Sequence, residues 1–409
     1  MKHFNKEHRA VVLGLSITGL GVIRSLGKEG LKVLGFDYTD KRDVGFYSRY
    51  VKSNICPHPA YQPEKLIEFL VKRLKKESKK SILFPTSDEF VKFISDHRDL
   101  LERYFLFNIS SQDVLDSIMD KKAQYELARR AETAIPETYY PESFEEIHAI
   151  EKQLEYPLII KARYSFGWRE KLGGVFKGFK ADNLSELIEQ YKKICEKKIP
   201  IIVQKIIIGS NINHFKFCVY IDKSNKFLMK FTLRKIRQYP VEFGVGSCVE
   251  SIKYKELEEV GVKFFKGIGY KGIGSAEFKL DLEDNKLKLI ELNPRYWMQN
   301  EQAAVCGANF ALAQYLDLSD QGAIMSDDFK IGVKWIDPVQ DFKSFIGQNH
   351  LSAVSLFSWL VFLFKCGISS VFDKHDLKPF LRSMNFGLNL FKLPYFLYKT
   401  VSKTGKEVL

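Results

Sequence analysis

Two glutamates and an asparagine in the second half of the chain have the spacing of a metal site. Residues 274–293 are predicted to form two strands joined by a turn. If this turn centres on Asp284, Glu277 and Glu291 lie opposite each other and Asn293 points to the same side. Two facing carboxylates repel, and a divalent cation between them removes that cost. Since Mg²⁺ binds carboxylate and amide oxygens together with phosphate and water, the hairpin predicts a magnesium site.

The same hairpin could instead be a solvated surface whose acids are balanced by neighbouring lysines. Residues upstream of the hairpin favour the magnesium site over a solvated surface. Lys161 ends an apolar strand, and the glycine-bearing segment 162–175 that follows it is of the kind that folds backbone amides over phosphates. Lys121 lies in a helix predicted over residues 117–131. Either lysine alone is more often a surface charge, but ahead of the hairpin the two predict a phosphate site.

A glycine-rich turn at residues 14–21 follows the first predicted strand, and Asp37 ends the next strand. This pattern invites a dinucleotide interpretation, but the fingerprint requires glycine where Ser16 stands, because the backbone there must approach a pyrophosphate. We favour a tight turn that offers its amides and the Ser16 hydroxyl to a small anion. The alternative is that the glycines serve only helix-strand packing.

Two further polar stretches could contact a substrate. Residues 85–89 place polar groups at a strand end, where open α/β sheets bind ligands, and Asp88 is the candidate there. Ser87 or Asp88 could instead cap the helix that follows. The second stretch is basic and alternates with apolar residues, so its cations could reach one face and bind a substrate carboxylate, or form a solvated edge strand. Its members are Arg234, Lys235 and Arg237.

The elements that must position these side chains divide into three parts. Residues 1–115 alternate short apolar runs with helical patterns, which predicts a parallel α/β domain. In residues 116–320 strands and helices cluster, which predicts an α+β domain with lobes at about 116–200 and 201–320. Residues 321–409 are poor in glycine and rich in Leu and Phe, which predicts a helical C-terminal segment.

Composition excludes several classes of protein. The chain has 409 residues, 45% of them apolar, and no low-complexity tract or repeat, so it is neither disordered nor fibrous. Its six cysteines stand 23 or more positions apart without a zinc-binding motif, which indicates a reducing compartment. The N-terminus lacks the apolar core of a signal peptide, so we expect a cytoplasmic protein.

The net charge of +13 favours an anionic partner. Nucleic acid is not expected, because the basic residues are dispersed. Residues 351–364 carry no charge but are too short to span a bilayer, which takes about 20 residues. Residues 351–409 hold eight Lys or Arg against three Asp or Glu, interleaved with aromatic and aliphatic side chains. They could contact an anionic membrane peripherally, at its inner face, or pack on the rest of the protein.

Taken in order, these motifs resemble the ATP-grasp superfamily, over about residues 10–315. Two strings, 234–240 and 85–89, resemble the branch of carboxylate–amine ligases that includes D-aspartate ligase. The motifs that carry the superfamily resemblance are Asp120-Lys121, Lys161 and its loop, the stretch 203–209, Glu277, and Glu291-Leu292-Asn293-Pro294-Arg295.

The resemblance implies ATP and Mg²⁺ as cofactors. It implies that Lys121 and Lys161 hold the α- and β-phosphates. A loop would close over the γ-phosphate through Ser165, Gly167, Gly173 and Gly174. Gln204, Lys205 and Ile207 would border the adenine. Where family members place an acid for the ribose hydroxyls, this chain has Asn211, which can still form a hydrogen bond but without charge assistance.

The resemblance also implies the reaction. Glu277, Glu291 and Asn293 would ligate Mg²⁺, and the catalytic residues Arg295 and Lys161 would balance charge on the transferred phosphoryl group. A carboxylate would become an acyl phosphate that an amine attacks, with release of ADP and phosphate. The substrates would be a small-molecule acid and an amine, and the amine could belong to a cell-envelope precursor. The alternatives are an ATP-grasp carboxylase and a non-catalytic, membrane-associated nucleotide sensor.

Overall fold

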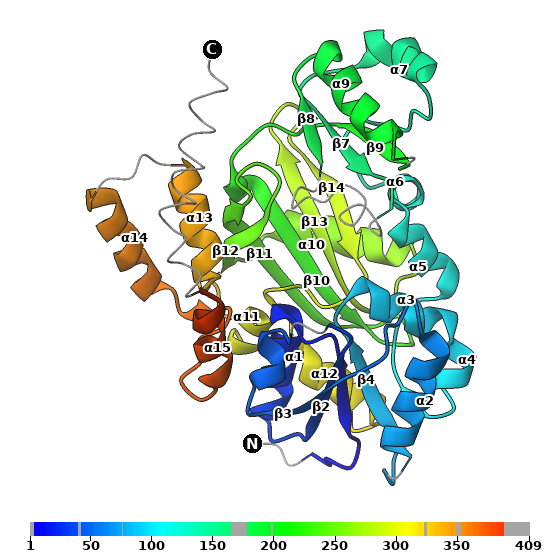
Figure 1. The fold of residues 1–409 in the computed structure, drawn as a ribbon, viewed down its shortest axis with the longest axis vertical. Helices are drawn as coiled ribbons and strands as arrows, with labels where there is room; N and C mark the ends of the chain where they lie inside the picture. Colours follow the sequence, from blue (N-terminus) through cyan, green and yellow to red (C-terminus); the bar gives the residue numbers. More distant parts are fainter. Residues whose placement is uncertain are drawn as a thin grey trace.

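Three β-sheets follow one another along the longest axis of the molecule (Figure 1). A five-stranded sheet lies at one end, a seven-stranded sheet in the middle and a four-stranded sheet at the other end. The predicted combination of a parallel α/β part, an α+β part and C-terminal helices is confirmed. The computed structural model describes residues 4–39, 42–75, 77–164, 178–197, 199–322, 325–348 and 353–387.

The N-terminal sheet is parallel throughout, with strand order β3-β2-β1-β4-β5. Side chains of its central strand alternate between two apolar cores, since Val11 and Leu13 face one cluster and Ala10 and Val12 face the other. This alternation places helices on both faces of the sheet. Its elements are β1 (Ala10–Leu13), α1 (Ile17–Gly27), β2 (Val33–Asp37), η1 (Val44–Tyr47), β3 (Val51–Ile55), α2 (Pro63–Leu74), β4 (Ser81–Pro85), α3 (Asp88–Asp96), α4 (Arg98–Leu101) and β5 (Phe105–Leu106).

The helix predicted over residues 117–131 is in fact two helices, α5 (Gln112–Met119) and α6 (Lys121–Arg130). Asp120 separates them with an extended backbone, φ −99° and ψ 112°. Its carboxylate accepts a hydrogen bond from the backbone N–H of Lys122 at 2.9 Å, so it caps α6. The same carboxylate pairs with Arg163 at 2.6 and 2.8 Å. The prediction missed the break because the helix-period pattern continues through it.

The four-stranded sheet forms a small lobe with its helices on one face. Leu158 and Ile160 pack against Ile147, Leu187 and Tyr191 of these helices. Alternate residues therefore lie on the opposite face. The lobe contains β6 (Thr138–Tyr139), α7 (Phe144–Ile150), η2 (Glu151–Gln153), β7 (Leu158–Ala162), β8 (Phe179–Ala181), α9 (Leu184–Cys195) and β9 (Ile201–Lys205), in the antiparallel order β6-β9-β7-β8.

The seven-stranded sheet carries aromatic side chains on one face and charged side chains on the other. Phe217 and Phe278 pack against Phe264 and Phe265 of a covering helix. Its strands, in the order β14-β13-β10-β11-β12-β15-β16, are β10 (His214–Ile221), β11 (Phe227–Tyr239), β12 (Val245–Ser251), β13 (Gly272–Asp281), β14 (Lys286–Asn293), β15 (Lys334–Ile336) and β16 (Ile368–Ser369). The accompanying helices are η3 (Asn211–Asn213), α10 (Lys255–Gly267), α11 (Asn300–Val305) and α12 (Phe310–Leu318).

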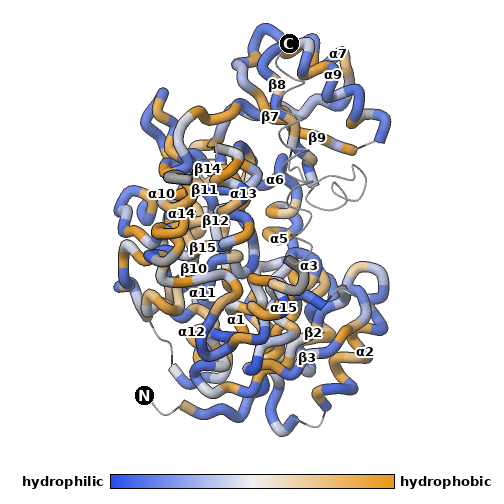
Figure 2. Tube along the Cα trace, turned by 60° about the vertical axis from the view of Figure 1, so that its left-hand side comes forward, coloured by the Kyte–Doolittle hydropathy of each residue, from blue (hydrophilic) through white to orange (hydrophobic). Residues whose placement is uncertain are grey.

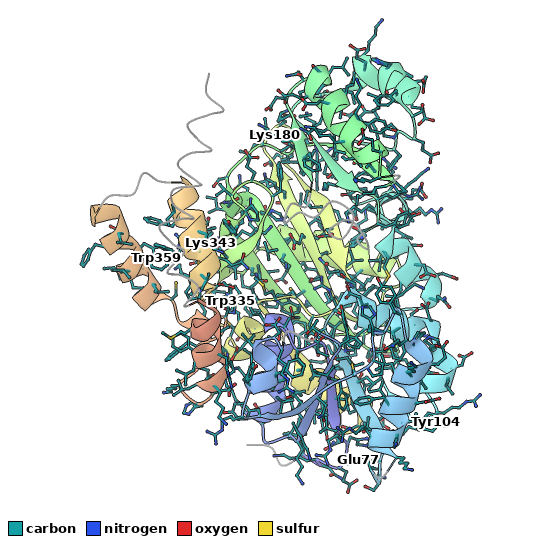
Figure 3. All side chains as sticks on the ribbon, in the orientation of Figure 1. Glu77, Tyr104, Lys180, Trp335, Lys343 and Trp359 are labelled. Carbon is teal, nitrogen blue, oxygen red and sulfur yellow. The ribbon has the colours of Figure 1, made fainter. Side chains whose placement is uncertain are left out.

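The C-terminal segment contains the predicted helices, α13 (Pro338–Gln348), α14 (Ala353–Lys365) and α15 (Lys378–Gly387). It also supplies β15 and β16, which the sequence analysis did not predict and which extend the central sheet. Trp359 of α14, labelled in Figure 3, lies on the side of α13. Its ring packs on those of Phe342 and Phe345 in that helix. Within the ranges that the structure describes, every helix is too short or too polar to cross a bilayer.

A buried ion network ties this segment to the N-terminal sheet. Arg24 of α1 bonds Asp376 at 3.1 Å and Glu301 at 3.2 Å, and it also donates to the carbonyl of Val371. Asp376 in turn accepts from the hydroxyl of Ser48 at 2.7 Å. Both Arg24 and Asp376 are fully buried, so the network joins residues more than 300 positions apart in the sequence.

Candidate active site

The predicted pairing of the two glutamates in the hairpin β13–β14 is confirmed, although the register next to the turn differs by one residue. Glu277 and Glu291 are direct partners across the two strands, and Asn293 is the partner of Ser275. A one-residue bulge follows, so that Phe278 pairs with Leu289. The bulge lies between the facing glutamates and the turn. On the turn side each partner on β14 comes one position earlier than predicted, as in Asp281 with Lys286, so the turn is centred between Glu283 and Asp284. The extra residue, Ile290, is therefore what brings Glu277 opposite Glu291.

Glu277 is surrounded by basic side chains from the neighbouring strands. Its carboxylate lies 3.0 Å from Nε2 of His214, 3.2 Å from Nζ of Lys216 and 3.3 Å from Nζ of Lys235. Burial alone would raise the pKa of Glu277, but Lys235, Lys216 and His214 hold it well below its ordinary value. Burial, with a contribution from Lys235, lowers the pKa of His214 to about 4, so His214 is neutral at pH 7.

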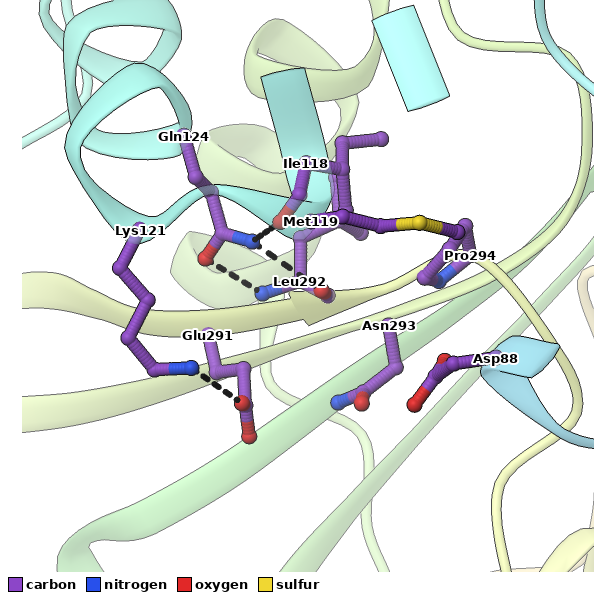
Figure 4. Close-up of a pocket in the computed structure, with 9 residues that line it drawn as sticks. All are labelled: Asp88, Ile118, Met119, Lys121, Gln124, Glu291, Leu292, Asn293 and Pro294. Carbon is purple, nitrogen blue, oxygen red and sulfur yellow. Dashed lines mark hydrogen bonds and ion pairs between the residues drawn. The ribbon is translucent and has the colours of Figure 1, made fainter. Parts of the chain in front are cut away.

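Glu291 opens instead into a pocket (Figure 4). Its carboxylate lies 3.5 Å from Nζ of Lys121, the first residue of α6. Gln124 of the same helix bonds both the N–H and the C=O of Leu292, at 3.0 and 3.2 Å, and so fixes β14 against α6. The pocket is lined by Asp88, Ile118, Met119, Lys121, Gln124, Glu291, Leu292, Asn293 and Pro294.

Asp88 reaches this pocket from the N-terminal sheet and forms a forked pair with Arg295. The two bonds from the guanidinium measure 2.8 and 3.3 Å. Arg295 also donates to Oδ1 of Asn293 at 3.3 Å. The capping alternative is not supported, since Ser87 occupies the N-cap position of α3 without a side-chain cap bond to any described residue. Asp88 is therefore placed to orient Arg295.

Lys161 and Gln204 lie together on the helix-free face of the small lobe. The Lys161 ammonium donates to Oε1 of Gln204 at 2.7 Å, and Gln204 donates to the hydroxyl of Thr138 at 2.8 Å. Lys205 is held by Glu283 at 2.7 Å and by Glu155, which connects the small lobe to the hairpin turn. These contacts bring Lys161 and Gln204 together, while Lys205 pairs with two acids, Glu155 and Glu283.

The remaining nucleotide-binding candidates lie beside the same hairpin or outside the described residues. Ile207 is buried, and its carbonyl accepts a hydrogen bond from Lys279. Asn211 begins η3, directly before β10. The predicted phosphate loop falls outside the described residues, and with it Ser165, Gly167, Gly173 and Gly174.

The three basic residues of β11 do not share one face, contrary to expectation. Lys235 pairs with Val249 and Arg237 with Cys248, so a bulge at Ile236 changes the alternation. Only Lys235 reaches Glu277. Arg234 bonds Glu250 at 2.7 Å, and Arg237 forms a forked pair with Asp341 at 2.7 and 2.8 Å.

The glycine-rich turn near Ser16 is used largely for packing. A side chain on Gly19 would come within 2.0 Å of the carbonyl oxygen of Gly14. The backbone N–H of Leu15 donates to the Asp37 carboxylate at 2.6 Å, so this amide is already satisfied inside the fold. Ser16 stands at the N-cap position of α1. These contacts favour the packing interpretation, and the anion role of Ser16 stays a prediction.

Sequence reasoning missed the basic residues of β10 and the tie formed by Gln124. His214 and Lys216 alternate with Phe215 and Phe217, a period-2 pattern that predicts one polar and one apolar face. That pattern could have identified them. Nothing local in the sequence indicates that Gln124 bonds a strand 168 residues away.

The residues present fit a magnesium ion on the Glu291 side. Mg²⁺ takes one or two carboxylates and completes its octahedron with water and phosphate oxygens, so Glu291 and Asn293 are sufficient protein ligands. Across the described residues, no three His, Cys, Asp or Glu side chains gather into a cluster that could hold a metal ion. For Glu277, a metal would have to displace Lys216 or Lys235, so its role as a ligand stays a prediction.

Part of the chain matches a known family of domains. Residues 120–311 match the family model described as the ATP-binding domain of the carbamoyl-phosphate synthase L chain. These residues therefore form an ATP-binding domain of the ATP-grasp type, and the resemblance drawn from the motifs is confirmed.

Individual relatives agree with this class. The chain is 24% identical over 321 residues to D-aspartate ligase of Enterococcus faecium (strain Aus0004), covering 75% of this chain and 76% of that one. L-amino acid ligase from Bacillus licheniformis shares the fold, with a TM-score of 0.58, 14% identity and coverage of 80% and 77%. The biotin carboxylase domain of Hydrogenobacter thermophilus 2-oxoglutarate carboxylase, solved with MgADP and bicarbonate, gives a TM-score of 0.61, 17% identity and coverage of 80% and 73%.

Proposed function

We propose that this protein is an ATP- and Mg²⁺-dependent carboxylate–amine ligase that forms an amide bond through an acyl phosphate and releases ADP and phosphate. The observation that carries the proposal is the pocket in which Lys121, Glu291 and Asn293 meet beside Arg295. A cation, two oxygen ligands and a guanidinium are the groups that phosphoryl transfer to a carboxylate requires. Similarity to D-aspartate ligase along three quarters of the chain supports the ligase class.

Charged and polar residues in and around the pocket have roles in the proposed reaction. Lys121 forms an ion pair with Glu291 in this structure. It would bind a phosphate once Glu291 and Asn293 bind the metal. Magnesium-bound ATP supplies the electrophilic phosphoryl group. Arg295, oriented by Asp88, would neutralise charge on that group during transfer. Lys161, oriented by Gln204, would bind a second phosphate.

The nucleotide base and ribose would lie between the small lobe and the hairpin. Gln204, Lys205 and Ile207 form the border on one side, since Ile207 contacts Lys279 and Lys205 contacts Glu283 of the hairpin. Asn211 would hydrogen-bond a ribose hydroxyl without charge assistance. Closure of the loop at Ser165 to Gly174 over the γ-phosphate is part of the same proposal and rests on the resemblance alone.

Of the basic residues in β11, Lys235 is best placed to meet a substrate acid. It is buried, it lies on the same face of the sheet as Glu277, and it lines a small pocket with Lys216 and Gln299. Arg234 and Arg237 are engaged with Glu250 and Asp341. We therefore assign carboxylate binding to Lys235 and structural roles to the two arginines.

The test is a screen of purified protein for phosphate release with ATP, Mg²⁺ and a matrix of acids against amines. A productive pair should then yield a hydroxamate when hydroxylamine replaces the amine, because a strong nucleophile traps an acyl phosphate. Release of ADP with the true pair but without trapping would count against the acyl-phosphate step. An amine carried by a cell-envelope precursor belongs in the matrix.

A carboxylase is the second candidate, since one structural neighbour is a biotin carboxylase domain that binds bicarbonate. Bicarbonate-dependent phosphate release that needs an amine acceptor but no organic acid would favour it. Nucleotide binding without turnover across the whole matrix would favour a sensor instead.

A further inference from the structure

Large apolar side chains are exposed along the outer faces of α14 and α15. Phe357, Leu360 and Val361 have the spacing of one helix face, and Phe357 is 68% exposed. Leu381 and Met384 of α15 are 56% and 50% exposed. In Figure 2 the tube of α14 is mainly hydrophobic in colour, and Figure 1 shows this helix on the outside of α13.

The opposite faces of the same helices attach them to the protein. Trp359 is buried, packs on Phe342 and donates a hydrogen bond to Asp341 at 2.9 Å. In the α15 region, Asp376 is held by Arg24 in the buried ion network. The exposed side chains of α14 are therefore not a core left open by poor packing, because Trp359 on the opposite face of this helix is buried. The helix α15 contacts η1 through Arg382, whose guanidinium lies 4.8 Å from the ring centre of Tyr47.

In residues 353–387 the acidic side chains face the interior of the protein and the basic side chains face outward. The two acids of residues 353–387 point inward, since Asp373 pairs with Lys28 at 2.6 Å and Asp376 pairs with Arg24. The basic side chains of this stretch are exposed. They are Lys365, Lys374, Lys378 and Arg382. The outward charge is therefore positive, next to the apolar side chains.

We propose that this surface docks on an anionic lipid bilayer, with α14 and α15 lying in the interface. We call it the C-terminal surface, and it consists of Phe357, Leu360, Val361, Leu377, Leu381 and Met384 with Lys365, Lys374, Lys378 and Arg382. An amphipathic helix with apolar anchors and basic flanks binds the headgroup region of anionic membranes. The described helices are too short to span one.

Charge complementarity favours lipid over a second copy of this chain. Two copies meeting through this surface would bring four exposed cations of each chain together, which repels. Residues 388–409 add four lysines and one glutamate, so the positive charge of the sequence continues beyond the described helices. Anionic headgroups neutralise this charge.

The test is co-sedimentation of the full-length protein with vesicles of neutral phosphatidylcholine, or of phosphatidylcholine mixed with phosphatidylglycerol. We expect pelleting with the anionic vesicles only, reduced by high salt. The double variants K374E/K378E and L381S/M384S should each weaken the partition by about tenfold or more. Because these side chains are exposed, both variants should keep the wild-type melting temperature.

Matched variants elsewhere control for general effects of charge and polarity. Tyr61→Ser removes an apolar side chain that is 71% exposed on the N-terminal part, and Lys255→Glu reverses a charge whose side chain is 91% exposed. Both should bind vesicles as the wild type does. Binding that the controls weaken as much as the C-terminal variants do would overturn the assignment to this surface.

Two other results would also overturn the proposal. One is recovery of the wild-type protein in the supernatant with both kinds of vesicle. The other is self-association, seen by light scattering and lost in L381S/M384S, together with no vesicle binding, which would identify a second copy as the occupant. The proposal does not depend on the ligase reaction, because the readout is membrane partition without substrate.

Discussion

The two glutamates that face each other across β13 and β14 have the same chemistry and opposite surroundings. Glu277 is enclosed by Lys216, Lys235 and His214, whereas Glu291 has Lys121 at 3.5 Å and opens into a pocket. The pairing of two strands therefore decides which side chains meet, but the elements on either side decide what each side chain can do.

The order of strands explains this difference. β13 has β10 as its second neighbour, and β11 lies beyond β10, so basic residues of these strands reach Glu277. β14 is the outermost strand on its side of the sheet as described, and α6 lies next to it. An edge position leaves Glu291 room for a ligand, while an inner position supplies Glu277 with counter-ions.

The largest expected effect is that of Glu291→Gln. Because this change removes a ligand of the metal, we expect turnover to fall by about 10³-fold, the equivalent of several kcal/mol of transition-state stabilisation. The melting temperature should stay near that of the wild type, since Glu291 is partly exposed and its ion pair with Lys121 is long, at 3.5 Å. Phosphate release at saturating ATP and varied Mg²⁺ measures the effect, with Glu259→Gln as an exposed control. Normal turnover and normal Mg²⁺ dependence would contradict the metal role.

Glu277→Gln should act mainly on stability. It leaves two buried lysines without their counter-ion, a change that costs about 3 kcal/mol of folding free energy. We expect a lower denaturant midpoint, and nucleotide affinity that changes less than the free energy of unfolding does. If denaturation curves match the wild type while the Mg²⁺ dependence is lost, Glu277 is a metal ligand and the contrast with Glu291 disappears.

Asp88→Asn tests whether the N-terminal sheet contributes to the site by orienting Arg295. The amide cannot form the charged fork, so we expect kcat to fall by about 10- to 100-fold while the KM values for the acid and amine change little. Asp88→Glu should restore part of the rate. A rise in one KM with unchanged kcat would instead mean that Asp88 binds substrate directly.

The smallest effect is expected at the far end of the hairpin, where Asp281 pairs with Lys288 at 2.6 Å. Burial would raise the pKa of Asp281, but the hydrogen bond from Lys288 lowers it below its usual value. The pair therefore stabilises the fold above the unfolded pKa near 3.9, and this contribution is lost as the pH falls through the lower folded pKa. Asp281→Asn should cost about 1 kcal/mol at pH 7. Urea melts at pH 7 and pH 3 should show the difference from wild type shrinking in acid, and a constant difference would contradict this account.

Local pattern was sufficient to predict the alternating α/β layers, because the hydrophobic period is a short-range property. The facing glutamates were predicted correctly but from a turn centred on Asp284, whereas a bulge at Ile290 is what brings them opposite each other. The pairing of Asp88 with Arg295 could not be predicted, since it joins residues 207 positions apart. Bulges could not be predicted from the sequence either. The bulge at Ile236 changed which basic residues of β11 contact Glu277. Strands β15 and β16 were missed because they are only three and two residues long.

The buried network around Arg24 has a practical consequence for anyone shortening this protein. Ending the chain before residue 371 would remove Asp376 and the carbonyl of Val371, and would leave a fully buried guanidinium with Glu301 as its remaining acid. An uncompensated buried charge costs several kcal/mol, a large part of the stability of an average domain. An expression fragment cut at the apparent end of the ATP-binding domain should therefore be insoluble or unstable for reasons unrelated to catalysis, and Arg24→Met in the same fragment is the change most able to rescue it.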